Sequence, residues 1–149
     1  MIIGFYQLLT RPVEAVLPQL VVKALEAGHR LLVRSDDAAL LARLDALLWD
    51  FAPASFVPHG RVDALAPERV ASQPVLLGAE WPAANGADFL MQIGDDLPDA
   101  LDGLKRAAFL FGENELETAR ARWRTVKALA GMEPAYWREG SGGRFEKVA

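Results

Sequence analysis

Cysteine is absent from the sequence, and this absence excludes disulfide bonds, thiolate catalysis and cysteine-ligated zinc. Long hydrophobic runs are absent too: the apolar run at residues 107–111 (AAFLF) is typical, whereas a membrane-spanning helix needs about 20 residues. The first ten residues, MIIGFYQLLT, have no basic region and no small-residue cleavage site, so we expect no signal peptide. These absences predict a cytoplasmic protein that has no contact with a membrane.

Basic residues do not exceed acidic ones: 16 Lys and Arg stand against 20 Asp and Glu, which gives a formal net charge of −4. Sequence-independent nucleic-acid binding normally needs a basic excess, so any contact with DNA is expected to be local or indirect. A hydrophobic fraction of 52% places the chain among globular proteins, and 149 residues are typical of one domain. We therefore expect a single domain over residues 1–149.

Glycine motifs that hold phosphate groups are missing as well. The loop after the first predicted strand reads Leu-Thr-Arg-Pro at residues 9–12, where a dinucleotide-binding fold would have G-x-G-x-x-G. Neither a P-loop nor a G-x-S-x-G nucleophile elbow occurs. His29 and His59 have no second ligand at metal-binding spacing, so we interpret them as ordinary surface or turn histidines. The glycine and histidine patterns thus predict neither a cofactor nor a bound metal.

The first half of the sequence alternates strand and helix patterns. Apolar residues 2–9 predict a buried strand, and Pro12 marks the start of a helix whose apolar positions recur at helical spacing until Gly28. A second strand is expected at residues 30–33. Ser35 or Asp36 is expected to cap a second helix with five leucines on one face, namely Leu40, Leu41, Leu44, Leu47 and Leu48. This alternation predicts parallel strands joined by crossover helices.

The second half has a less regular pattern. Prolines and glycines between residues 50 and 69 predict a loop, with a short extended piece at 55–57. Strands are expected at 75–78 and 89–94 as an antiparallel insertion, followed by a short helix at 97–105 and a strand at 107–111. Asn114 is expected to cap a helix over 115–130, and a hairpin of 136–137 with 144–145 follows. Together these elements predict an α/β fold, a Rossmann-like three-layer sandwich with a mostly parallel sheet and helices on both faces.

Two acidic pairs each follow a predicted strand: Asp36 with Asp37, and Asp95 with Asp96. Carboxylates at the carboxyl ends of parallel strands are where α/β folds hold Mg²⁺ for phosphoryl transfer. Asp is also common at helix starts, where it accepts hydrogen bonds from backbone N–H groups and suits the helix dipole. The sequence therefore leaves two interpretations, a magnesium-dependent phosphoryl-transfer enzyme or four structural carboxylates.

Aromatic residues near the middle of the chain form a first candidate surface. Trp49 ends the second predicted helix, and Phe56 follows in a loop bounded by Pro53 and Pro58. Large aromatic side chains on such a loop are candidate anchors for a protein partner. Covering the end of the sheet is the equally favoured alternative.

The last predicted helix carries a second candidate surface. At about 100° per residue, Arg120, Arg124 and Lys127 fall within roughly 60° of one another. Leu116 and Trp123 lie at the border of an arc that is expected to face the core, which holds Ala119, Val126 and Ala130. A basic stripe against an apolar rim suits a ligand with negative charge and an aromatic or aliphatic group, and arginine suits bidentate carboxylate binding. A solvated amphipathic helix is the alternative.

A series of short motifs runs through the chain in a distinctive order. They are F-Y-x-L-L at residues 5–9, H-R-L-L-V-R-S-D-D at 29–37, L-D-x-L-L-W at 44–49, S-F-V-P-H at 55–59, A-R-x-R-W-R-x-x-K at 119–127, Y-W at 136–137 and G-R-F-E-K at 143–147. L-W followed by S-F-V-P-H is the most specific of them. In this order, the motifs resemble the chi subunit family of the bacterial DNA polymerase III holoenzyme.

This resemblance implies a non-catalytic accessory subunit of the clamp-loader complex, with a Rossmann-like fold and no nucleotide site. It implies that one surface binds the psi subunit through Trp49, Phe56, Val57 and Pro58. A separate surface would bind the acidic C-terminal tail of single-stranded-DNA-binding protein, which ends in Phe, through Arg120, Trp123, Arg124 and Lys127. Leu116 stands where relatives can have Lys, so we expect this site to be less basic and more apolar. DNA would be contacted only indirectly, through the binding protein.

Overall fold

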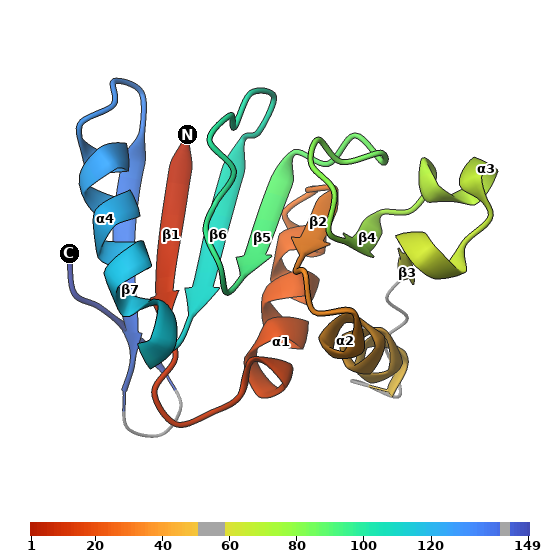
Figure 1. Cartoon of the computed structure of the whole chain (residues 1–149), viewed down its shortest axis with the longest axis horizontal. Coiled ribbons are helices and arrows are strands. Elements are labelled where there is room, and N and C mark those ends of the chain that lie inside the picture. Colours follow the sequence, from red (N-terminus) through yellow and green to blue (C-terminus); the bar gives the residue numbers. More distant parts are fainter. Residues whose placement is uncertain (51–58, 141–143) are drawn as a thin grey trace.

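A computed structural model describes residues 1–50, 59–140 and 144–149 of the chain. These residues form one eight-stranded sheet in the order β3-β4-β2-β5-β6-β1-β7-β8 (Figure 1). All neighbouring strands are parallel except β7 and β8, which are antiparallel. The strands are β1 (Ile2–Gln7), β2 (Leu31–Arg34), β3 (His59–Arg61), β4 (Val75–Gly78), β5 (Phe89–Ile93), β6 (Arg106–Phe111), β7 (Glu133–Glu139) and β8 (Phe145–Lys147). The helices are α1 (Val13–Glu26), α2 (Ala38–Asp50), α3 (Pro67–Val70) and α4 (Leu116–Lys127), with 3₁₀ turns at Val62–Ala64 and Glu113–Glu115.

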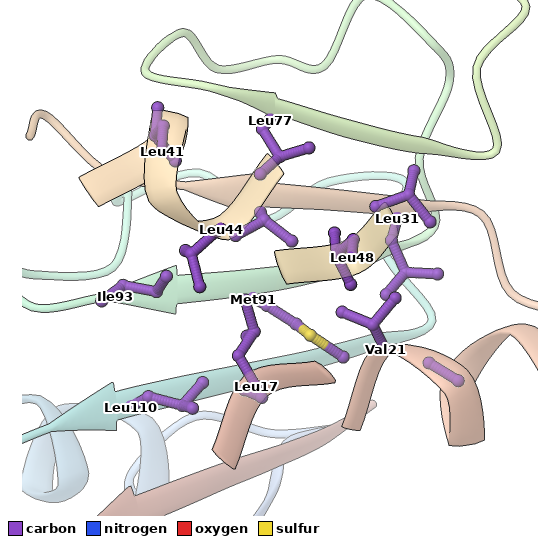
Figure 2. Close-up of a cluster of buried hydrophobic side chains, with 14 of the residues drawn as sticks. Leu17, Val21, Leu31, Leu41, Leu44, Leu48, Leu77, Met91, Ile93 and Leu110 are labelled. Carbon is purple, nitrogen blue, oxygen red and sulfur yellow. The ribbon is translucent and has the colours of Figure 1, made fainter. Parts of the chain in front are cut away.

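Helices on both faces of the sheet make three layers. On one face, α1 and α2 bury their apolar side chains against β2, β4, β5 and β6, and Figure 2 shows Leu17 of α1 and Leu44 of α2 on either side of Met91. On the other face, Ala119 and Val126 of α4 are buried in a second cluster with β1 and β6. Burying one leucine side chain completely contributes about 1.5–3 kcal/mol, so these two clusters hold the layers together. The predicted three-layer α/β fold is confirmed.

The first half of the chain folds as its sequence predicts, except at one helix cap. β1, α1, β2 and α2 follow one another, and Pro12 directly precedes α1 in an extended conformation. Asp37 caps α2, because its Oδ1 accepts a hydrogen bond from the backbone N–H of Leu40 at 3.1 Å. The Oγ of Ser35 accepts one from the N–H of Asp37. The expectation that Ser35 or Asp36 caps this helix is wrong, since the position directly before the first helical residue is Asp37.

β4 and β5 do not form the predicted antiparallel insertion. Each pairs in parallel with β2, from opposite sides, so the connection over residues 79–88 must return along the sheet before β5 begins. Asn85 anchors this connection, because its buried side-chain amide donates hydrogen bonds to the carbonyls of Leu31 and Gln73 at 3.0 and 2.9 Å. The apolar pattern of each strand predicts where it lies along the chain, but its direction depends on these remote contacts.

Two further expectations for the second half are wrong. Residues 97–105 contain no helix, and this segment is held by Leu97, which is 3% exposed, and by the indole N–H of Trp81, which donates to the carbonyl of Ala100. The predicted loop at 50–69 contains β3, a 3₁₀ turn and the start of α3. Gly60 allows β3 to lie under Leu65, since a Cβ at this glycine would come 2.6 Å from the Leu65 side chain. The extended piece expected at 55–57 lies outside the described residues.

The C-terminal part follows the prediction with adjusted limits. α4 is preceded by a 3₁₀ turn that contains Asn114, and the helix has no side-chain cap, so the expected Asn114 cap is wrong. Ala130 is exposed beyond the end of the helix, so it does not face the core as expected. The predicted hairpin is confirmed, with Trp137 paired to Lys147 and Glu139 to Phe145. No helix in the described part of the chain has the length and apolarity needed to cross a membrane.

A buried carboxylate holds the loop that follows β1. Glu139 on β7 is 3% exposed, and its two oxygens accept hydrogen bonds from the backbone N–H groups of Leu9, Thr10 and Arg11, from the Thr10 hydroxyl and from Arg11 Nε, at 2.6–3.2 Å. Burial by itself raises the pKa of this carboxyl, but the bonds from Thr10 and Arg11 outweigh burial and lower the pKa from 4.5 to about 2. The chain's own carboxylate therefore occupies the loop where dinucleotide-binding folds hold a phosphate group.

Candidate protein-binding site

α4 presents two different faces. Ala119 and Val126 are 0% and 2% exposed and face the sheet, whereas Arg120, Arg124 and Lys127 are exposed. The helical spacing that predicts this basic stripe also predicts the buried positions, because side chains three and four residues apart share one face. The stripe expected from the sequence is thus present on the surface of the molecule.

The basic residues of α4 differ in their acidic partners. Arg122, which is not part of the stripe, binds Asp96 through Nε at 3.0 Å and Nη2 at 2.9 Å, and it also reaches Asp99 at 3.2 Å. The hydrogen bonds to Asp96 raise the pKa of this guanidinium further. Within the described ranges 1–50, 59–140 and 144–149, no ion pair involves Arg120, Arg124 or Lys127. These three cations can therefore bind an external anion without giving up an acidic partner in the described structure.

Apolar side chains border the stripe, Leu116 before its first residue and Trp123 along its side. Trp123 packs edge-on against Phe5 and Tyr136, with ring centroids 5.4 and 5.8 Å apart. Leu116 is half-buried and lines a hollow of about 570 Å³ at the carboxyl ends of β1 and β6, together with Leu8, Leu9 and Val13. Trp123 lies seven positions after Leu116, about 10 Å along the helix axis, so the two side chains do not form one slot. Arg120 lies one turn from each of them.

Tyr136 belongs to this surface, and the sequence analysis placed it only in a strand. Its hydroxyl donates a hydrogen bond to Gln7 Oε1 at 2.6 Å, and its ring contacts Trp123. Burial raises the pKa of the Tyr136 hydroxyl, and the charges of Arg120 and Arg138 partly oppose that rise. The sequence does carry a signal for this position, because successive side chains of a strand point to opposite faces of the sheet. Tyr136 therefore faces α4, and Trp137 faces the other side of the sheet.

The first candidate surface is described only in part. Trp49 is 53% exposed in the last turn of α2, beside Leu48, which is 1% exposed. The Trp49 ring lies 4.7 Å from the ring of His59. His59 is itself 6% exposed, and its Nε2 lies 2.9 Å from the carbonyl of Asp45. This histidine is therefore a buried link between α2 and β3, which corrects the expectation of a surface or turn residue.

The other residues expected at that surface, Phe56, Val57 and Pro58, lie outside the described residues. His29, the second histidine, is half-buried, and its Nδ1 lies 3.3 Å from Asp88 Oδ2. Its ring also packs edge-on against Phe89, with centroids 5.2 Å apart. Both histidines thus have neighbours that explain their positions without a metal.

The four carboxylates of the magnesium interpretation have separate surroundings. Asp37 caps α2, and Asp36 beside it is exposed. Asp96 binds Arg122 and accepts a hydrogen bond from the N–H of Leu97, while Asp95 has a positive φ of 49° in the turn after β5. Among the described residues, no three His, Cys, Asp or Glu side chains gather closely enough to hold a metal ion. The donor set that phosphoryl transfer would need is not assembled there.

Known proteins resemble this chain along most of its length. Residues 1–134 match the model of the family described as DNA polymerase III chi subunit, HolC. The chain is also 32% identical over 104 residues to the DNA polymerase III subunit chi of Pseudomonas aeruginosa, and this alignment covers 70% of each chain. The family match ends just inside β7, so most of β7 and all of β8 lie beyond it.

Proposed function

Because this chain belongs to the DNA polymerase III chi subunit family, we propose that it is a non-catalytic accessory subunit of the cytoplasmic clamp-loader complex. In this role it links the psi subunit to the acidic C-terminal tail of single-stranded-DNA-binding protein, and it reaches DNA through that protein. The observation that carries the proposal is the basic stripe of α4, whose three cations have no acidic partner among the described residues.

The tail offers three groups that match the α4 surface. Its terminal carboxylate needs a pair of parallel donors, which the guanidinium of Arg120 or Arg124 supplies and the ammonium of a lysine does not. Its terminal Phe ring needs an apolar hollow, and the hollow at Leu116 lies one helical turn from Arg120. Its upstream acidic residues need positive charge, which Lys127 supplies at the other end of the stripe.

A direct titration tests this proposal. The wild-type chain and two variants, Arg120→Ala and Lys127→Ala, are titrated with a short acidic peptide that ends in Phe. A charge-assisted hydrogen bond to a desolvated carboxylate is worth about 1.5–3 kcal/mol, against about 1 kcal/mol or less for an exposed ion pair. Arg120→Ala is therefore expected to weaken binding more than about tenfold, and Lys127→Ala less, with raised salt removing most of the smaller difference.

Two controls sharpen the titration. Arg69→Ala removes an exposed arginine from α3 and should leave peptide affinity unchanged. A peptide without its terminal Phe should lose as much affinity as the Arg120→Ala variant does with the intact peptide. Equal and fully salt-sensitive losses in all basic variants would instead describe a diffuse basic surface with no specific site.

Binding of the psi subunit is assigned to the end of α2. Trp49 is half-exposed there, although the neighbouring Leu44 and Leu48 are buried. An exposed Trp beside a buried core is the kind of residue that dominates the energy of protein interfaces. Phe56, Val57 and Pro58 extend the proposed surface from the segment that follows α2.

A further inference from the structure

A groove on the opposite face of the sheet from α4 carries no assigned role. Its volume is about 560 Å³, and it runs beside α1 over β6, β1 and β7 toward the terminal hairpin. On this face α1 and α2 pack on β2, β4, β5 and β6, whereas the described residues of β1 and β7 contribute no fully buried apolar side chain to that cluster. The face of β1 and β7 is therefore left without a covering helix.

Small residues make this part of the sheet hollow. Gly4 of β1 is in register with Ala108 of β6 and Ala135 of β7, so three neighbouring positions on one face lack large side chains. Tyr6 folds back over Gly4, where an added Cβ would come 2.6 Å from its ring. The Tyr6 ring therefore lies close to the sheet and lines the groove together with side chains of α1, of the loop after β1 and of the terminal hairpin.

Aromatic rings form the floor of the groove. The rings of Tyr6 and Trp137 are parallel within 8°, with centroids 6.4 Å apart. Phe145 of β8 packs edge-on against Tyr6, with centroids 5.3 Å apart. All three rings are half-buried. Trp137 and Phe145 lie beyond the residues that match the family model, so this floor is built by the part of the chain that the match does not reach.

The charge along the groove has one sign. Four Lys and Arg residues line it together with His29, and none of the described lining residues is acidic, although the whole chain has a net charge of −4. Arg11 contacts Glu139, and His29 contacts Asp88. By contrast, Lys23, Arg106 and Arg144 form no ion pair within the described part of the chain. The groove is consequently a local anion-attracting surface on an acidic protein.

We propose that this groove binds a short stretch of single-stranded nucleic acid directly. Bases stack on aromatic side chains without sequence preference, and phosphates follow a line of cations. Arg106 begins β6 whereas Arg144 lies beside the end of β7, so cations lie at both ends of these strands, about 20 Å apart. An acidic peptide fits less well, because the backbone groups of a sheet face are already paired and give a peptide backbone no partners.

This contact goes beyond the proposed function, because it uses neither the binding-protein tail nor α4. With few cations and a net negative chain, the isolated protein should bind a strand weakly and lose it at physiological salt. Once the tail holds the protein on a coated strand, the second contact becomes intramolecular and gains from a high effective concentration. A groove of low affinity can then bind segments of the DNA strand that the binding protein leaves uncovered.

Fluorescence anisotropy of the full-length chain with a labelled oligothymidylate of about 10 nucleotides tests this inference. Titrations at several salt concentrations between about 50 and about 200 mM give the slope of log affinity against log salt, and each phosphate contact contributes about 0.7 to that slope. Lys23→Gln and Arg106→Gln should each weaken binding about threefold or more at the lowest salt. Each should also reduce the slope by about 0.7. The exposed control Arg69→Gln should change neither quantity.

Trp137→Leu tests the aromatic floor, and it is compared at a temperature where thermal unfolding shows the variant to be folded. Loss of one stacked base should weaken binding about fivefold or more with an unchanged salt slope. Undetectable binding at about 50 mM salt, equal losses in Arg69→Gln, or losses only in Arg120→Ala would overturn the groove assignment. Because Arg120→Ala should leave strand binding intact while it weakens peptide binding more than about tenfold, failure of this inference is distinguishable from failure of the tail proposal.

Discussion

Glu139 is the residue on which the loop after β1 depends most. Its carboxylate accepts hydrogen bonds from three consecutive backbone N–H groups, from a hydroxyl and from a guanidinium, and these bonds lower its pKa to about 2 although burial acts in the opposite direction. A carboxyl whose pKa is lower in the folded state stabilises that state above its ordinary pKa of about 4.5. This stabilisation is lost as the pH falls from about 4.5 through about 2.

The first prediction follows from the lowered pKa of Glu139. Glu139→Gln should lower the free energy of unfolding at neutral pH by about 3 kcal/mol, since lowering the pKa from 4.5 to about 2 corresponds to roughly that energy. The difference between wild type and variant should fall to a small remainder near pH 2, where about half of the Glu139 carboxyl is protonated in the folded state. Urea unfolding measured from pH 2 to pH 7 checks this, with Glu117→Gln on the exposed side of α4 as control. A difference that stays constant with pH would mean that packing, and not charge, holds the loop.

Residues of this kind are the ones that the sequence predicts least well. The positions of Arg120, Arg124 and Lys127 follow from local helical spacing, which the structure preserves. The partners of Glu139 and Tyr136 lie about 130 positions away in the sequence, so no local pattern connects them. Their roles depend on the pairing of β1 with β7, which brings both ends of the chain together.

α4 is an element to whose two sides we assign separate roles. Arg122 ties it to the segment after β5 through Asp96 and Asp99, while the stripe of Arg120, Arg124 and Lys127 faces outward. Arg122→Ala should therefore lower the free energy of unfolding by about 1–2 kcal/mol and leave affinity for the acidic peptide unchanged. Chemical unfolding and peptide titration of the same sample check both parts, and Arg120→Ala is the matched arginine variant with the opposite expectation. A large loss of peptide affinity in Arg122→Ala would show that the whole helix binds as one basic surface.

α2 offers a second element-scale prediction. Trp49→Ala should weaken association with a psi subunit more than about tenfold, because half-exposed aromatic residues at interface centres carry much of the binding energy. The fold should survive, since about half of the Trp49 ring is already in contact with solvent. Co-purification and thermal unfolding measure the two effects, and Phe56→Ala should behave in the same way. If the variants unfold and do not lose only the partner, these aromatic residues belong to the core and the interface assignment is wrong.

Elements with a regular pattern are predictable from the sequence, and elements fixed by distant contacts are not. The sequence predicts β1, α1, β2 and α2 well, because the apolar spacing and the positions of proline and glycine agree along this part of the chain. β3 and α3 are short and lie among prolines and glycines, and β3 forms only by pairing with β4. Residues 97–105 have leucines at helical spacing, but Leu97 is buried within a loop and Trp81 bonds to Ala100. Tertiary contacts determine the structure of these segments.

At the scale of the whole molecule, the two proposed protein surfaces lie far apart. Trp49 contacts His59 of the edge strand β3, whereas α4 packs near β1 and β7 toward the other edge (Figure 1). Six strand spacings separate β3 from β7, about 28 Å. This separation allows both partners to bind at the same time, as a link between two assemblies requires.

The most direct test of that link measures retention of the chain on single-stranded DNA coated with its binding protein at physiological salt. The surface is prepared with either the intact binding protein or a form that lacks its acidic C-terminal tail. We predict retention on the intact coat, loss of more than about tenfold with Arg120→Ala, and background retention on the tail-less coat. Equal retention of the wild-type chain on both coats would contradict the assignment of α4 as the site that binds the tail.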